Sequence, residues 1–130
     1  MKKLITLVFL LTIGTALGQT NETMNEFDSN FAHTVYFWLK NPDNPADRKA
    51  FETSLRTFLD NSAYAKTQFI GTPPSASRDV VDGSFTYSLI VTFESAEEQQ
   101  LYQDEPPHKK FVEESSGLWT KVIVYDSNSI

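Results

Sequence analysis

The sequence predicts an α+β domain whose strands and helices follow the order β-α-β-β-α-β. Four short segments are rich in β-branched and aromatic residues, and two longer segments carry apolar residues at helical spacing. The predicted strands are FAHTVYFWLK (31–40), AKTQFIG (65–71), SFTYSLIVTF (84–93) and LWTKVIVY (118–125). This order is the split βαβ pattern of ferredoxin-like folds, which predicts one four-stranded antiparallel sheet with helices on one face.

The first predicted strand is apolar on both of its faces. Alternation places His33, Val35 and Phe37 on one face and Tyr36 and Trp38 on the other. A two-layer α+β sandwich covers one face of its sheet with helices and leaves the other bare. Because large aromatic side chains on a bare face need cover, we expect a homodimer in which two sheets pack face to face.

The first helix is predicted between residues 44 and 62. Asn44 fits the N-cap and Pro45 fits the first helical position. One apolar stripe follows at helical spacing, made of Phe51, Leu55, Phe58 and Leu59. The segment is therefore an amphipathic helix that lies on the sheet.

The third strand and the second helix also have clear signals. The alternating residues predicted for the core face of the strand are Phe85, Tyr87, Leu89, Val91 and Phe93. Ser95 fits an N-cap with Glu98 three residues later, which is a capping box. Pro106 and Pro107 break this helix, which resumes through His108 to about residue 114.

The N-terminus fits a signal peptide at residues 1–18. MKK is a basic start, LITLVFLLTI is an apolar run, and the small residues of ALG offer a cleavage site. The run is shorter than the roughly 20 apolar residues that span a bilayer. No cysteine follows it for a lipid anchor, so we expect a periplasmic or secreted protein with no membrane contact after cleavage. We then expect a flexible lead at 19–30, the domain at 31–126 and a tail at 127–130.

Composition excludes several function classes. Without Lys2 and Lys3 the mature chain keeps 9 of its 11 basic residues against 17 acidic ones, a net charge of −8 that argues against nucleic acid as a partner. The chain has no cysteine, so an exported domain of this kind holds together without disulfides. No phosphate loop, dinucleotide fingerprint or nucleophile elbow is present, and we expect no cofactor.

Four stretches together resemble the stress-responsive A/B barrel (Dabb) domain family, one branch of the dimeric α/β-barrel proteins. They are the histidine-bearing FAHTVYFWLK, the block FIGTPPSASRDVVDGSFTYSLIVTFES, the block YQDEPPHKKF and the closing LWTKVIVYDS. The resemblance runs over residues 31–126. It implies a ferredoxin-like protomer that pairs into a dimeric α/β barrel.

The resemblance also implies a site. In a cofactor-free polyketide cyclase of this family, the histidine of the tyrosine–proline–histidine block is the base, and the tyrosine, a first-strand histidine and a last-strand tryptophan line the pocket. By position these residues match His108, Tyr102, His33 and Trp119, of which the first three are our candidate catalytic residues. The residues we expect to line the pocket are Val35, Phe37, Leu55, Leu89, Val91 and Trp119.

Two charged residues leave alternatives open. The family often has histidine before the first proline of the block, where this chain has Glu105. The Glu105 side chain then either lies near His108 or points to solvent. Arg78, in the long polar connection before the third strand, either binds a ligand carboxylate, holds the dimer, or forms a solvated ion pair.

Each candidate site residue has a structural alternative. His108 has an unperturbed pKa of about 6.5 and fits a general base, but its ring could instead bond a carbonyl left free by the prolines. His33 could be a hydrogen-bonded core residue, and the Tyr102 ring is of core size. The two histidines and Glu105 could form a metal triad, but their spacing matches no metal motif and we expect no metal.

Three hypotheses for function remain. The first is an exported dimer that binds a small apolar, aromatic or polyketide-like molecule, with cofactor-free, cyclase- or lyase-like proton transfer by His108 as its enzymatic form. The second is a non-catalytic, stress-related binding module. The third is a haem- or quinol-handling monooxygenase, because other dimeric α/β barrels do such chemistry. The enzymatic form requires that the His108 ring and the Tyr102 hydroxyl share one cavity.

Overall fold

The computed structural model describes residues 27, 28 and 30–130. The predicted signal peptide and most of the predicted lead therefore lie outside the described residues. The elements in chain order are β1 (Phe31–Leu39), α1 (Pro45–Asn61), β2 (Thr67–Gly71), β3 (Tyr87–Phe93), α2 (Ala96–Asp104), α3 (Pro106–Ser115), the 3-10 turn η1 (Ser116–Leu118) and β4 (Trp119–Asn128).

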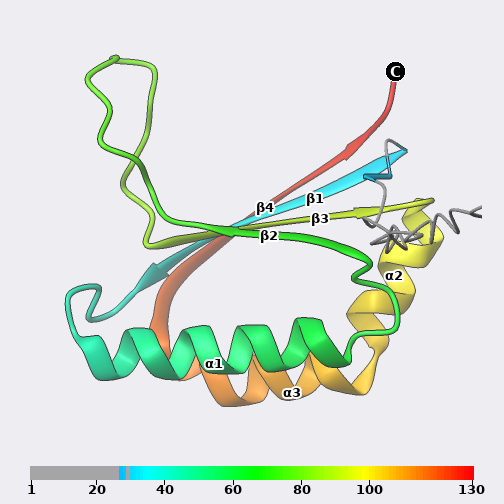
Figure 1. Cartoon of the computed structure of the whole chain (residues 1–130), viewed down its shortest axis with the longest axis horizontal. Coiled ribbons are helices and arrows are strands. Elements are labelled where there is room, and N and C mark those ends of the chain that lie inside the picture. Colours follow the sequence, from blue (N-terminus) through cyan, green and yellow to red (C-terminus); the bar gives the residue numbers. More distant parts are fainter. Residues whose placement is uncertain (1–26, 29) are drawn as a thin grey trace, which may run out of the picture.

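The four strands form one antiparallel sheet in the order β2-β3-β1-β4. All the described helices lie on one face of this sheet, and no helix or strand of the described residues covers the opposite face (Figure 1). We call that opposite side the bare face. The predicted ferredoxin-like α+β fold is confirmed, with the second predicted helix divided into α2 and α3.

The core fills the space between the sheet and α1. Phe51 and Leu55 of α1 are fully buried, and the Phe51 ring stacks on Tyr87 of β3 with centroids 5.0 Å apart. Phe51 also contacts Phe37 of β1 at 5.0 Å. The predicted apolar stripe of α1 therefore faces the sheet, as its helical spacing requires.

Side-chain caps begin the first two helices where the sequence predicts them. The Asn44 side chain accepts hydrogen bonds from the backbone nitrogens of Ala46 and Asp47, at 2.9 and 3.3 Å. Ser95 accepts from the backbone nitrogen of Glu98 at 3.1 Å. Both contacts satisfy N–H groups that have no partner inside a helix.

Two boundaries differ from the sequence prediction. β3 begins at Tyr87, and Phe85 contacts Tyr36 on the bare face with ring centroids 4.9 Å apart. The alternation changes at Thr86, whose hydroxyl accepts the Leu39 backbone N–H at 3.0 Å and whose backbone nitrogen donates to the Phe37 carbonyl at 2.7 Å. At the other end of the chain, β4 runs into the predicted tail, since Asn128 pairs with Phe31.

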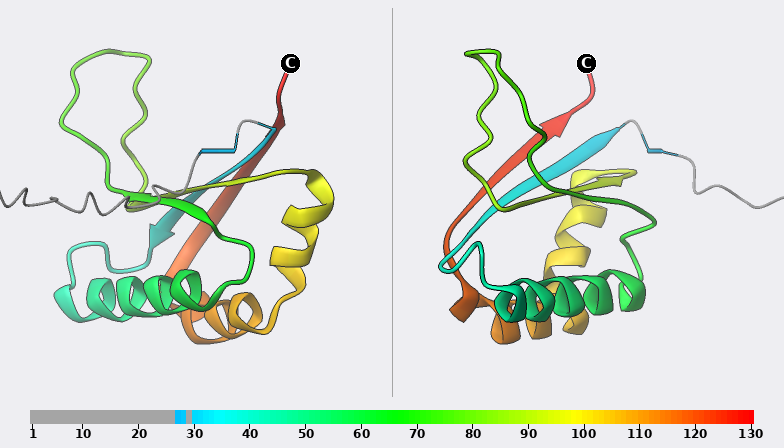
Figure 2. Two further views of the ribbon diagram at one scale, coloured as in Figure 1. Left: turned by 45° about the vertical axis from the view of Figure 1, so that its right-hand side comes forward. Right: turned by 60° about the vertical axis from the view of Figure 1, so that its left-hand side comes forward.

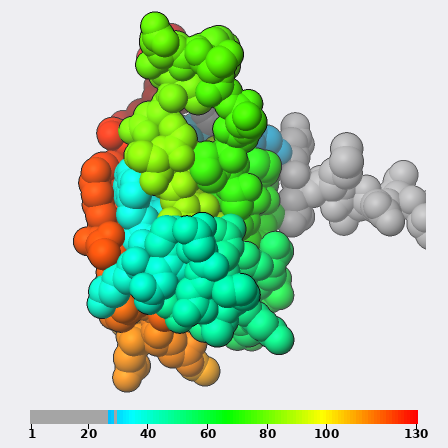
Figure 3. Space-filling view, turned by 90° about the vertical axis from the view of Figure 1, so that its left-hand side faces the viewer, coloured from blue at the N-terminus to red at the C-terminus, as the bar shows by residue number. Residues whose placement is uncertain are grey.

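A long loop (residues 72–85) connects β2 to β3 and rises on the side of the bare face (Figures 1 and 2). In Figure 3 the loop, in bright green, stands above the rest of the molecule. Residues 74–80 of the loop are exposed. No helix in the described part of the chain is long and apolar enough to cross a membrane.

Candidate active-site pocket

A pocket of about 290 Å³ lies between the sheet and α2–α3, toward β4. Its lining residues are His33, Val35, Phe37, Phe58, Leu89, Tyr102, Gln103, His108, Phe111, Val112, Trp119, Val122 and Val124. Most of this lining is apolar. The polar exceptions are the three candidate catalytic residues and Gln103.

His33 is one of the buried polar residues of the pocket. It occupies the helix-facing side of β1 and is only 3% exposed. Its register partner on β4 is Asp126, whose Oδ1 lies 2.6 Å from His33 Nδ1. The carboxylate therefore orients the ring, and Nε2 has no hydrogen-bond partner among the described residues.

Tyr102 projects from α2 next to His33, with ring centroids 5.7 Å apart. It is 1% exposed, and burial, followed by the nearby Glu105 carboxylate, raises the pKa of its phenol. The hydroxyl is protonated at neutral pH, as an ordinary phenol is, and the raised pKa keeps it so at higher pH. Within the described chain it makes no hydrogen bond, so it is available to a ligand.

His108 lies in the first turn of α3, with its ring centroid 5.2 Å from that of Tyr102. Burial is the largest cause that lowers the His108 pKa below its usual value, followed by the charge of His33. The Gln103 carbonyl and Asp104 oppose this shift. Since the lowering causes dominate, the ring is neutral at physiological pH and can accept a proton.

The prolines explain the position of His108. In a continuous helix the nitrogen of Pro107 would donate to the Gln103 carbonyl, but proline has no N–H. The His108 ring faces that carbonyl instead. The His108 ring thus both lines the pocket and contacts the Gln103 carbonyl, two positions that the sequence presented as alternatives.

Glu105 takes neither of the two positions expected for it. It is 8% exposed and points away from the pocket, toward the C-terminal end of α1. Its carboxylate accepts hydrogen bonds from the Ser62 hydroxyl and from the Ala63 backbone nitrogen, the latter at 3.0 Å. The contact ties the α2–α3 break to α1, three residues from both Tyr102 and His108.

The structure brings together most of the predicted lining, with two corrections. Leu55 and Val91 do not line this pocket, because both are fully buried in the core below it. Trp119 does line it and contacts Phe37 at 5.4 Å. Arg78 is far in the fold from this site, in loop 72–85, and forms no ion pair with a described residue.

The sequence reasoning missed Asp126 and the outer wall of the pocket. Asp126 has the same parity as Val122 and Val124 in the last strand, and a ferredoxin-like sheet places that strand beside the first. This signal was therefore available. Phe58 and Phe111 gave no such signal, because a core aromatic and a pocket aromatic have the same helical spacing.

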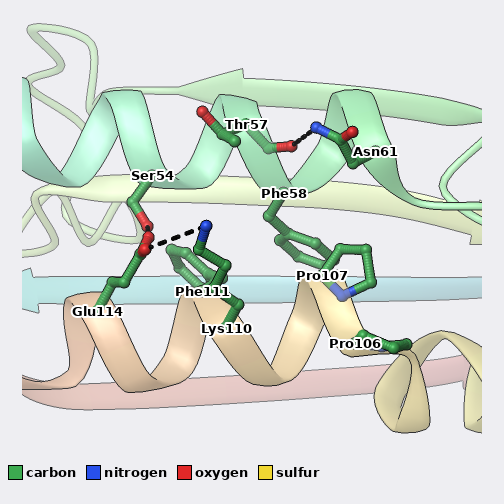
Figure 4. Close-up of a pocket in the computed structure, with 9 residues that line it drawn as sticks. All are labelled: Ser54, Thr57, Phe58, Asn61, Pro106, Pro107, Lys110, Phe111 and Glu114. Atoms are coloured by element: carbon green, nitrogen blue, oxygen red, sulfur yellow. Dashed lines mark hydrogen bonds and ion pairs between the residues drawn. The ribbon is translucent and has the colours of Figure 1, made fainter.

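A second hollow, of about 320 Å³, lies on the surface between α1 and α3 (Figure 4). Phe58 and Phe111 form its floor, and their stacked rings separate it from the histidine pocket. At its rim the Ser54 hydroxyl donates to Glu114 at 3.0 Å, and Lys110 lies 3.6 Å from the same carboxylate. Because its polar groups satisfy one another, we favour the histidine pocket as the functional site.

The described residues contain no group of three or more His, Asp or Glu side chains that could hold a metal ion. Glu105 binds Ser62 and Ala63, so it does not complete the triad considered from the sequence. The chemistry available to the pocket comes from two imidazoles, one phenol and the carboxylate behind His33.

The fold and this pocket define an α/β-barrel protomer of the ferredoxin-like class. The model of the Stress Responsive A/B Barrel Domain (Dabb) matches residues 31–129, and the chain belongs to this family. No curated protein matches the chain.

Solved structures share the fold at low sequence identity. A hydroxynitrile lyase from Passiflora edulis has a TM-score of 0.66 and 19% identity, covering 79% of this chain and 95% of that one. A Dabb family protein from Mesorhizobium loti has a TM-score of 0.64 and 20% identity, covering 77% and 96%. A dimeric ferredoxin-like protein of unknown function from Thermobifida fusca has a TM-score of 0.62 and 13% identity, covering 79% and 94%.

Proposed function

We propose that this protein is an exported homodimer that binds a small apolar or aromatic molecule, including polyketide-like ones, in the histidine pocket of each protomer. The proposal includes a cofactor-free proton transfer with His108 as the base. The observation that supports it best is the convergence of His33, Tyr102 and His108 on one mainly apolar pocket.

The size and lining of the pocket support a small ligand. Its volume of about 290 Å³ is just below the range typical of ligand sites, which is roughly 300–1,000 Å³, so it suits a small molecule. Valine and aromatic side chains form most of the wall. Val124 and Val112, which are 47% and 39% exposed, lie at the solvent side and would be covered by an apolar ligand.

The electrostatics support a division of roles. A neutral His108 can remove a proton at neutral pH, because its pKa is lowered. A protonated Tyr102 can donate a hydrogen bond to the oxygen on which negative charge develops. His33, oriented by Asp126, presents Nε2 as a second polar contact for the substrate.

The lyase-like form rests on the acid–base residues of the pocket, since the fold is shared both by an antibiotic biosynthesis monooxygenase-like protein from Chloroflexus aurantiacus and by the hydroxynitrile lyase. The lyase is 19% identical to this chain, so the likeness by itself shows the fold alone. The alternative function is a binding module without catalysis, and it uses the same pocket and the same dimer.

Dimerisation through the bare face is supported by the aromatic side chains there. Tyr125 and Phe69 are each 59% exposed in the protomer, and the similar Thermobifida fusca protein is dimeric. Export is supported by the N-terminal pattern, and N-terminal sequencing of protein from its host tests it. We expect the mature chain to begin near residue 19.

A native mass spectrum of protein purified from its host tests dimer and ligand together. We expect a dimer mass with one small molecule per protomer. The molecule, once identified, is then incubated with the wild type, with His108→Gln and with Tyr102→Phe, using the exposed neighbour Lys109→Gln as a matched control.

The outcomes separate the two functions. Conversion by the wild type and Lys109→Gln, with a loss of at least about 100-fold in His108→Gln, supports the enzyme. Binding without conversion in all variants supports the binding module. A ligand whose contacts, mapped by NMR, avoid Tyr102 and His108 contradicts both.

A further inference from the structure

We propose that loop 72–85 of each protomer reaches across the dimer and that Val80, at its tip, packs into an aromatic cleft on the bare face of the partner. This inference rests on the proposed homodimer and adds to it a specific contact. It assigns a role to a loop that contributes nothing to the histidine pocket.

The loop presents an apolar side chain to solvent, as expected of a segment that packs against another molecule. It contains no helix or strand, and ordered loops of this length in compact domains are usually functional. Val80 is 90% exposed, although valine is an apolar residue that folding normally buries. A turn in which the Val81 backbone nitrogen donates to the Arg78 carbonyl at 3.0 Å presents it to solvent.

The base of the loop is held in place. The Trp38 indole nitrogen donates to the Ser84 hydroxyl at 3.1 Å, which joins the loop to β1. The Ser84 backbone nitrogen donates to Asp82 at 2.8 Å. The loop is thereby directed away from the helices, on the side of the bare face (Figures 1 and 2).

Beside this base lies a cleft of about 330 Å³, which we call the aromatic cleft. Its lining residues are Tyr36, Trp38, Asp82, Phe85, Lys121, Ile123 and Tyr125. Lys121 Nζ lies 4.3 Å from the centre of the Trp38 ring, a cation–π contact. The cleft opens on the bare face, where the partner is proposed to pack.

The sheet order determines what lies opposite the loop. β2 and β4 are the two edge strands. A twofold axis parallel to the strands places β2 of one protomer over β4 of the other, which brings the exposed edges together. Because this rotation does not change the position of a residue along the strand direction, the same end of the sheet lies at the same height in both protomers.

The register then aligns the loop with the cleft of the partner. Tyr87, where the loop enters β3, pairs with Phe37, and its neighbour Trp38 pairs with Lys121. The loop and the aromatic cleft are therefore at the same end of the sheet. Packed sheets are about 10 Å apart, and half of the loop spans up to about 23 Å, so its tip reaches the partner.

The charges of the two surfaces are complementary. Arg78 and Asp79 directly precede Val80 at the tip, whereas Asp82 and Lys121 lie in the cleft. Arg78 forms no ion pair with a described residue of its own protomer. A valine preceded by one anion and one cation thus meets an apolar cleft that carries one group of each sign.

Cysteine cross-linking of the full-length protein tests the contact, and no native cysteine competes with the introduced ones because the chain has none. We expect Val80→Cys combined with Lys121→Cys to give a covalent dimer with a short bismaleimide. The matched control combines Val80→Cys with Val112→Cys, on the helix side, and Val80→Cys alone reports any contact between the two tips. Neither should cross-link above background.

A charge at the tip provides a second readout. We expect Val80→Asp to raise the dimer dissociation constant by about tenfold or more, with no change in protomer stability, because Val80 is 90% exposed. Leu101→Asp, at an exposed apolar site on α2, is the matched control and should leave dissociation unchanged.

The failures are distinguishable. A wild-type dimer without the Val80–Lys121 cross-link, and without an effect of Val80→Asp, overturns the loop contact and leaves the proposed function standing. A wild type that sediments as a monomer at micromolar concentration overturns both.

Discussion

The two faces of the sheet show how one set of strands serves two purposes. On the helix-facing side, Val35 and Leu89 are 4% and 1% exposed and belong to the protein core. On the bare face, Phe69 and Tyr125 are each 59% exposed, although phenylalanine and tyrosine residues also form the core. Neighbouring positions in the same strands thus have opposite environments.

This difference shows that, within one protomer, the core and the histidine pocket both form on the helix-facing side of the sheet. The helices form a solid core with the sheet around Phe51 and Leu55, which are fully buried. They leave space toward β4, where His33, Tyr102 and His108 meet. No helix of the described chain covers the bare face, and the proposed dimer would cover its aromatic residues.

The largest expected effect comes from the core side. Phe51→Ala removes a fully buried ring and should lower the free energy of unfolding by about 3–5 kcal/mol. Phe69→Ala, on the bare face, should cost the isolated protomer less than about 1 kcal/mol. Urea unfolding at protein concentrations below the dimer dissociation constant measures the free energy of unfolding of both variants. Equal losses of stability would contradict the distinction between the two faces.

The next effect concerns the bare face. Trp38→Ala should raise the dimer dissociation constant by about 30-fold, since a tryptophan buried in an interface typically contributes about 2 kcal/mol or more. Sedimentation equilibrium measures it, and Arg56→Ala, exposed on α1, is the control. An unchanged dimer would mean that a different surface pairs the protomers.

A smaller effect is expected where the pocket meets the helices. Glu105→Ala leaves the Ser62 hydroxyl and the Ala63 nitrogen without their acceptor and should destabilise the protein by about 1–3 kcal/mol. Glu105→Gln should cost less because it keeps one acceptor. Thermal unfolding compares them with Glu113→Ala, an exposed position on α3, and equal melting temperatures would refute this role.

The smallest effect is a pH dependence from the pocket. Burial and His33 lower the His108 pKa from 6.5, so the unfolded chain binds a proton at His108 more readily than the folded one. Stability from this group is complete above the unfolded pKa and falls as the pH drops from about 6.5 toward the folded pKa. The slope is at most about 1.4 kcal/mol per pH unit.

His108→Gln should remove this part of the slope in unfolding experiments between pH 5 and pH 7.5. NMR titration of the ring in the wild type should give a midpoint below 6.5. A midpoint above 6.5 would reverse the sign and remove the argument that the ring is neutral in the pocket.

The sequence by itself determined the order of the elements, because alternation and helical spacing are local properties. It determined the first helix through Asn44 and Pro45, the break at Pro106, and the two faces of the first strand. It also singled out His33, Tyr102 and His108, although through resemblance to a family more than through spacing, since they lie on three separate elements.

Only the tertiary structure decided which side chains meet. Leu55 and Val91 are apolar like Phe58 and Val124, but helix packing puts the first two in the core and the last two on the pocket wall. Asp126 orients His33, and Glu105 binds Ser62, through contacts 93 and 43 residues apart in the chain. Such contacts depend on the packing of whole elements, which a local pattern in the sequence does not contain.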